Sequence, residues 1–136
     1  MTKGVLLGLD VGEKRIGVAL ADGVVSIASP LTTVAGGEGE IKAIMALIAE
    51  YHPVSLIVGY PRNLQGEATA QTRYIEQFVA RLKENISITV EFQDESLTSV
   101  MAEQRLQMTK KPFNKGDIDA LAASYILQDY LETHGN

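Results

Sequence analysis

Apolar residues form short continuous runs at the start of the chain and repeat at helical spacing further along. Residues 4–10 are an apolar run that ends in an acid, which predicts a buried strand. A second strand is expected over 16–21, followed by the dipeptide Asp22-Gly23, which favours a two-residue hairpin turn. A third strand is then expected over about 24–34. The chain should therefore begin with an antiparallel meander of three strands.

The remaining elements alternate between helices and strands. Two helices are indicated by apolar residues at helical spacing, namely Ile41, Ile44, Met45 and Ile48, and then Tyr74, Ile75, Phe78, Val79 and Leu82. A buried strand is expected over 54–58 and another strand over 86–92, with further helices over about 98–108 and 117–132. This order predicts an α/β fold of the ribonuclease H-like type. Its mixed five-stranded sheet combines an antiparallel three-stranded meander with two parallel strands, and helices cover both faces.

Size and composition are those of one globular domain, expected to span residues 1–136. Hydrophobic residues make up 46% of the chain and charged residues 21%, and Cys is absent, which fits a reducing cytoplasm. No segment has the length of a secretion signal or a membrane span, so we expect a cytoplasmic protein. The net charge of −5 counts against non-specific nucleic-acid binding, which needs clustered Lys and Arg. Bound metal cations would cancel part of that charge locally.

Acidic residues stand where two predicted strands end. Asp10 closes the first strand, and Asp94-Glu95 follow the strand over 86–92. A desolvated acid is costly unless a cation accompanies it, so a pair of divalent metal ions is indicated. The simpler interpretation of Asp10 is a turn-forming residue at a strand end. Gly8 and Gly12, which leave room for a ligand to approach the backbone, favour the metal site.

Asp119 lies one turn into the last predicted helix, on the side expected to be buried. At 3.6 residues per turn it shares a face with Ala122, Ala123, Ile126 and Tyr130. Asp117 projects toward a more polar side and is interpreted as the N-cap of this helix. Attraction to the helix dipole is worth only about 0.3–1 kcal/mol, too little to explain an acid on the buried face. Asp119 is therefore better explained by a functional site.

Strand alternation does not decide between Asp94 and Glu95. They point to opposite faces, and both faces are expected to be covered by helices. One of the two could instead help to cap the following helix. Cations that could bind a phosphate are Lys14 and Arg15, shortly after Asp10, and Lys115 in a basic loop before the last helix.

With these residues in view, the chain resembles one family over essentially its whole length. The segment LGLDVGEKRIGVA is similar to the opening motif of the YqgF proteins, also called RuvX. Their second, third and fourth motifs resemble, in turn, residues 57–61 with Gly66, residues 94–99, and Lys115 with residues 119–123. Two departures stand out, since the family usually has Arg at the position of Ser96 and Leu at the position of Tyr60.

The resemblance implies a ribonuclease H-like nuclease that matures the 5′ end of 16S ribosomal RNA, with Holliday junction resolution as the alternative. Carried over by motif, the catalytic and metal-binding acids are Asp10, Glu95 and Asp119, with Asp94 as the alternate to Glu95. The expected substrate contacts are Lys14, Arg15, Asn63 and Lys115. Two Mg²⁺ or Mn²⁺ ions, about 3.5–4 Å apart, would activate a water and stabilise the departing 3′ oxygen.

Other classes of function remain open at this point. Asp10-Val11-Gly12 also resembles the phosphate-contacting hairpin of the actin and sugar-kinase superfamily, although those proteins clasp a nucleotide between two domains. The acidic charge and Ser96 are compatible with a non-catalytic module that binds RNA or the transcription machinery. Against this, a scaffold would be more stable with apolar groups in place of the acids. A junction resolvase would be expected to form a homodimer, because it must cut two symmetric strands.

Overall fold

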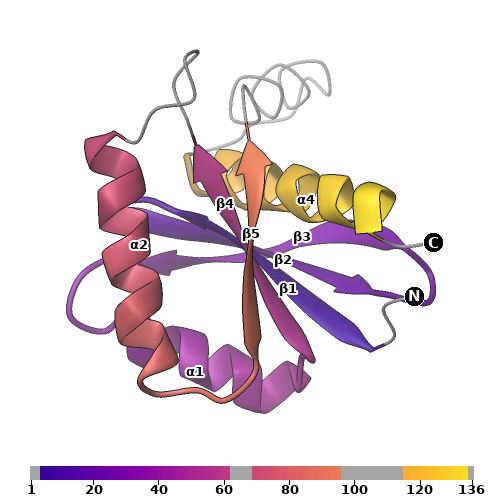
Figure 1. The fold of residues 1–136 in the computed structure, drawn as a ribbon, viewed down its shortest axis with the longest axis horizontal. Helices are drawn as coiled ribbons and strands as arrows, with labels where there is room; N and C mark the ends of the chain where they lie inside the picture. Colours follow the sequence, from indigo (N-terminus) through magenta and orange to yellow (C-terminus); the bar gives the residue numbers. More distant parts are fainter. Residues whose placement is uncertain (1–3, 62–68, 96–114, 135–136) are drawn as a thin grey trace.

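The computed structural model describes residues 4–61, 69–95 and 115–134, which form one mixed sheet with helices packed on it (Figure 1). The strand order is β3-β2-β1-β4-β5. Strand β1 lies in the centre, antiparallel to β2 and parallel to β4, and β4 is parallel to β5. The strands are β1 (Val5–Val11), β2 (Arg15–Asp22), β3 (Ile27–Ala35), β4 (Ser55–Pro61) and β5 (Thr89–Glu95). The predicted meander with two added parallel strands is confirmed.

Helices cover both faces of the sheet, as the sequence predicts (Figure 1). The helices are α1 (Glu40–Tyr51), α2 (Ala70–Lys83) and α4 (Lys115–His134). The helix expected over 98–108 and the candidate contact Asn63 lie outside the described residues. Within the described ranges, no helix is both long enough and apolar enough to cross a membrane.

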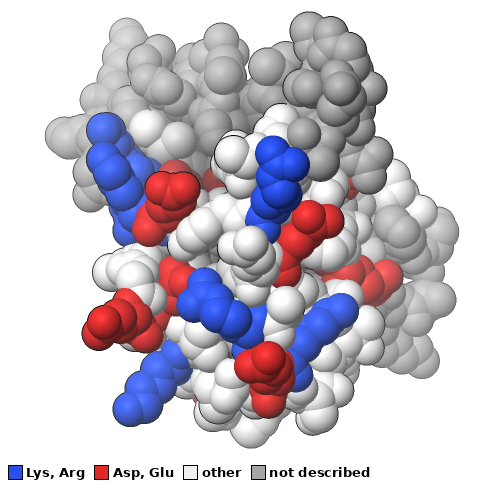
Figure 2. All heavy atoms as spheres, turned by 60° about the vertical axis from the view of Figure 1, so that its left-hand side comes forward, with Lys and Arg blue, Asp and Glu red and all other residues white. Residues whose placement is uncertain are grey.

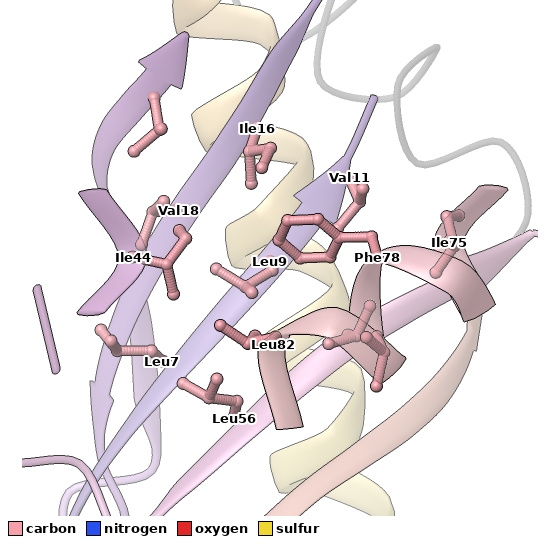
Figure 3. Packing of buried hydrophobic residues seen from close by; sticks show 13 residues of the cluster. Leu7, Leu9, Val11, Ile16, Val18, Ile44, Leu56, Ile75, Phe78 and Leu82 are labelled. Carbon is pink, nitrogen blue, oxygen red and sulfur yellow. The ribbon is translucent and has the colours of Figure 1, made fainter. Parts of the chain in front are cut away.

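Alternate residues of β1 divide the core into two layers. Leu7 and Leu9 pack with Phe78 and Leu82 of α2 on one face, which α1 also covers (Figure 3). Leu6 belongs to the opposite face, where the residues of α4 in the core are Ala123, Ile126, Leu127, Tyr130 and Leu131. Because successive side chains of a strand point to opposite faces, Asp10 belongs with Leu6 on the face that α4 covers.

The turn between β2 and β3 is longer than predicted. Asp22 is still part of β2 and pairs with Ile27, so residues 23–26 form a four-residue turn. The Asp22 carboxylate accepts a hydrogen bond from the Val24 N–H at 2.8 Å, and Ser26 adopts the left-handed conformation with φ 63°. The prediction of a two-residue Asp22-Gly23 turn was wrong, because this local side-chain hydrogen bond favours a wider turn.

Two further boundaries differ from the prediction in ways that matter for the acids. Helix α4 already includes Lys115, so Asp117 lies in its first turn and the N-cap interpretation was wrong. Pairing between β4 and β5 continues through Tyr60 with Asp94 and Pro61 with Glu95. Asp94 and Glu95 therefore lie within the paired part of β5 rather than after it.

Candidate active site at the carboxyl end of the central strand

Helix α4 lies almost directly on the sheet at two glycines. A Cβ atom at Gly17 would overlap the carbonyl oxygen of Asp119, and one at Gly8 would lie 2.9 Å from Cβ of Leu127. Gly17 is the antiparallel partner of Asp10. The backbone of Asp119 therefore lies over β2 immediately beside Asp10. Gly17 was missed in the sequence, although a glycine inside a predicted strand is a recognised signal of close backbone approach.

The carboxylates of Asp10 and Asp119 interact across this contact. Burial, and then the negative charge of Asp119, raise the pKa of Asp10 from 3.8 to about 6. Partial removal from water and a neighbouring like charge both disfavour the ionised carboxylate. A cation placed between the two acids would relieve both effects. The structure thus brings together two of the three acids predicted from the sequence, from strand β1 and helix α4.

Arg15 forms an ion pair with Asp119. Its Nε donates a hydrogen bond to Oδ2 of Asp119 at 2.6 Å, with 36% of the arginine side chain and 22% of the aspartate side chain exposed. The turn between β1 and β2 is closed by a bond from the Gly12 N–H to the Arg15 carbonyl, which returns Arg15 to the same end of the sheet as Asp10. Sequence reasoning placed Arg15 beside a phosphate and missed this ion pair, because its partners are 104 positions apart.

The register of β5 separates Asp94 from Glu95. Asp94 is exposed and lies opposite Tyr60, two residues after Phe92, on the side of the sheet that α1 and α2 cover. By strand alternation, position 95 belongs to the other face, over which α4 lies. The side chain of Glu95 is outside the description, and within the described residues no group of three potential metal ligands occurs.

The remaining basic candidates are exposed. Lys14 lies in the turn after β1, and Lys115 begins α4. The first turn of α4 is held to the sheet by Thr33, whose hydroxyl donates to the Gly116 carbonyl at 2.8 Å and whose backbone pairs with Gly17. Lys115 is therefore anchored one turn before Asp119.

A carboxylate on the central strand and another on the last helix, in a sheet of this order, define the class as a ribonuclease H-like nuclease fold. Two solved structures share the fold. One is Thermus thermophilus RuvC in complex with a Holliday junction substrate, with a TM-score of 0.60, 15% identity and 97% of both chains covered. The other is a fowlpox virus resolvase in complex with Holliday junction DNA, with a TM-score of 0.57, 13% identity, and 95% of this chain and 97% of that chain covered.

Within that class the chain belongs to the RuvX family, whose model, described as Holliday junction resolvase, matches residues 4–133. A relative from Chloroflexus aggregans named "Putative pre-16S rRNA nuclease" is 45% identical over 140 residues, covering 100% of this chain and 99% of the relative. A Sulfurihydrogenibium protein of the same name is 43% identical over 129 residues, covering 93% of this chain and 89% of the relative. The resemblance found in the motifs is confirmed.

Proposed function

We propose that this protein is a divalent-metal-dependent nuclease that acts in the cytoplasm on the 5′ end of precursor 16S ribosomal RNA. The observation that carries the proposal is the convergence of Asp10 and Asp119 at a partly desolvated position, where the pKa of Asp10 rises to about 6. Such an arrangement is unfavourable in the protein alone and becomes favourable when a cation binds. The names of relatives up to 45% identical support precursor rRNA as the substrate.

The acids of this site fit Mg²⁺ or Mn²⁺. Carboxylate oxygens are the ligands that both ions prefer, and Asp10 and Asp119 supply them from two rigid elements. Glu95 is the third proposed ligand, because the register of β5 assigns position 95 to the face that α4 covers. The exposed Asp94 follows Phe92 on the other face and is left out. A pair of such ions supplies an activated water and stabilises the departing oxygen.

The protein itself would keep the acids in position and orient the phosphate of the substrate. A guanidinium has five N–H donors, so the bond from Arg15 to Asp119 leaves donors for a phosphate oxygen. Lys14 and Lys115, both exposed, would add positive charge along the substrate backbone. Asn63, which lies outside the described residues, stays a proposed further contact. No side chain needs to act as the nucleophile.

The distribution of charge on the surface also affects how the substrate would bind. On the face that Figure 2 shows, basic and acidic side chains alternate over the described residues, and the whole chain carries a net charge of −5. Binding should therefore depend on contacts near the active site rather than on general attraction to phosphates.

Junction cleavage is the second candidate, favoured by the description of the family model and by the fold shared with RuvC. It would require a homodimer, since two symmetric strands must be cut. The test compares an end-labelled RNA spanning the 5′ boundary of 16S rRNA with a synthetic four-way DNA junction, each with Mg²⁺ or Mn²⁺. Cutting of the RNA alone supports the first proposal. Cutting of the junction alone, by a protein that sediments as a dimer, would replace it with the second.

A further inference from the structure

The turn between β1 and β2 leads into Arg15, and it is bonded to a segment that contains none of the proposed substrate contacts. Within the turn, the Gly12 N–H donates to the Arg15 carbonyl at 3.0 Å. From outside, the Gly36 N–H donates to the Lys14 carbonyl at 2.9 Å. Gly36 directly follows the last paired residue of β3, because Ala35 pairs with Arg15. The turn is therefore fixed from two sides.

The contact between Gly36 and the turn leaves no room for a side chain. A Cβ atom at position 36 would overlap the carbonyl oxygen of Glu13 and lie 3.1 Å from the carbonyl carbon of Lys14. Among the glycines of the described part of the chain, only Gly4 and Gly37 have a positive φ. The backbone of Gly36 is thus open to any residue, and it is the close contact that requires glycine.

The segment after Gly36 is anchored to helix α1. Gly37 turns the chain with φ 113°. Its N–H donates to Oε2 of Glu40 at 3.2 Å, and its carbonyl accepts a bond from the Glu40 N–H at 3.2 Å. Glu40 is the first residue of α1 and is 2% exposed. Because Gly36 is tied to a packed helix in this way, it can hold the turn in one position.

Arg15 reaches the acids directly from this turn. Its Nε donates to Oδ2 of Asp119 at 2.6 Å. A methyl group at position 36 must push the peptide between Glu13 and Lys14 away, and Arg15 is the next residue along the chain. A displacement of about 1 Å is enough to reduce a rate by an order of magnitude or more when a group must orient a reacting phosphate.

We propose that Gly36 is a positioning residue, which sets the place of the Arg15 guanidinium relative to Asp119 and the substrate phosphate. The inference rests on the proposed nuclease function. It adds the connection between β3 and α1 to a site whose other proposed groups come from β1, β5, α4 and the β1–β2 turn. Gly36 acts through its backbone and its lack of a side chain, and it does not itself touch the substrate.

The test compares Gly36→Ala with Gly39→Ala, which is the same substitution in the same connection. A Cβ atom at Gly39 would meet nothing within 4 Å. Gly36→Ala should lower kcat/KM for RNA about tenfold, whereas Gly39→Ala should match wild type. Binding of Mn²⁺, followed by electron paramagnetic resonance, should stay unchanged in both, because the acids are untouched. Loss of Mn²⁺ binding together with activity in Gly36→Ala would mean general disruption and would overturn the proposal.

A double-mutant cycle tests whether Gly36 acts through Arg15. In an Arg15→Gln background, Gly36→Ala should lower kcat/KM by less than about twofold, because two changes that act through one group are not additive. A further tenfold loss would overturn the proposal, and so would wild-type kcat/KM in the Gly36→Ala single variant.

Nuclear magnetic resonance supplies a readout that needs neither RNA nor metal. The Arg15 Nε–H signal should shift and exchange faster with solvent in Gly36→Ala, and should be unchanged in Gly39→Ala. If Gly36→Ala does not fold, hydrogen exchange in wild type decides, since a rapidly exchanging Gly36 amide would contradict its bond to Lys14. If the Nε–H signal responds as expected but wild type cuts no RNA with Mg²⁺ or Mn²⁺, the nuclease proposal fails and the positioning of Arg15 stands.

Discussion

Asp10 takes up a proton more readily in the folded protein than in the unfolded chain. Its pKa rises from 3.8 to about 6, first through burial and then through Asp119. The stability contributed by protonated Asp10 is therefore complete below about pH 4 and is lost as the pH rises through about 6. At neutral pH, the ionised carboxylate lowers the free energy of unfolding of the metal-free protein.

The first prediction concerns this residue. In EDTA at about pH 7.5, Asp10→Asn should raise the free energy of unfolding by about 1–3 kcal/mol, because it removes the disfavoured charge. At about pH 4 the gain should disappear, since wild-type Asp10 is then neutral as well. Urea denaturation at both pH values measures it. The same gain at both values would show that the charge of Asp10 is not the cause.

Two arginine–acid pairs in the described part of the chain provide a second prediction, in which effects on stability and on activity differ. Arg15 pairs with the partly exposed Asp119, whereas Arg81 pairs at 2.9 Å with Glu40, which is 2% exposed. Arg15→Gln should cost less than about 1 kcal/mol of stability but reduce kcat/KM for RNA at least about tenfold, because phosphate orientation is lost. Arg81→Gln should cost about 1–3 kcal/mol and leave kcat/KM unchanged. The reverse pattern would remove Arg15 from the site.

The third prediction separates the adjacent acids of β5. Glu95→Gln should abolish metal-dependent cleavage, whereas Asp94→Asn should retain activity within about threefold of wild type, because register assigns the two positions to opposite faces. Binding of Mn²⁺, followed by electron paramagnetic resonance, should weaken only for Glu95→Gln. Loss of Mn²⁺ binding in Asp94→Asn would exchange their roles.

At the residue scale, sequence patterns predicted the positions of the acids better than the groups that contact them. Asp119 could be placed on a buried face because helical spacing is fixed by local geometry. The face of the sheet on which Asp94 lies could be assigned only from the β4–β5 register, which no local sequence pattern contains. The pair between Arg15 and Asp119 depends on how α4 lies across the sheet, and the sequence alone does not give that crossing.

At the scale of elements, the position of α4 decides whether a site exists at all. Gly17 allows the helix backbone to lie on β2 at Asp119. We expect Gly17→Ala to lower the free energy of unfolding by about 2–4 kcal/mol, because the new methyl group must displace the helix. Cleavage should be lost together with stability.

The control for this prediction is Gly39→Ala at the N-cap of α1. Its Cβ would meet nothing within 4 Å, and its φ of −90° is open to any residue. Urea denaturation of both variants should show a loss within about 1 kcal/mol for Gly39→Ala. A Gly17→Ala protein as stable and as active as wild type would mean that α4 does not lie where the structure places it.

Helices and strands could be predicted where apolar residues form continuous runs or repeat at regular spacing. The five strands and the two helices α1 and α2 follow from runs and helical spacing. The errors lie at boundaries that are decided by side-chain hydrogen bonds or strand pairing. The bond from the Val24 N–H to Asp22 widened the turn between β2 and β3, and pairing with β4 extended β5 to Glu95.

At the scale of the whole molecule, the acidic charge and the mixed surface restrict how substrate is bound. A net charge of −5 gives little general attraction for a phosphate backbone. Discrimination between RNA and branched DNA must then come from the few groups around the carboxyl end of β1. The motifs predicted where these groups lie, but not the substrate that they select.

The most direct measurement is cleavage of end-labelled precursor 16S RNA with Mg²⁺ or Mn²⁺ by wild type, Asp10→Asn, Asp119→Asn and Asp117→Asn. Asp117 is the matched control, because it is exposed and only two residues from Asp119 in the same helix. We expect cutting at the 5′ boundary by wild type and Asp117→Asn, and a loss of at least about a hundredfold in the other two. Equal cutting by all four proteins, or none by folded, metal-loaded wild type, would contradict the assignment of this site as a nuclease centre.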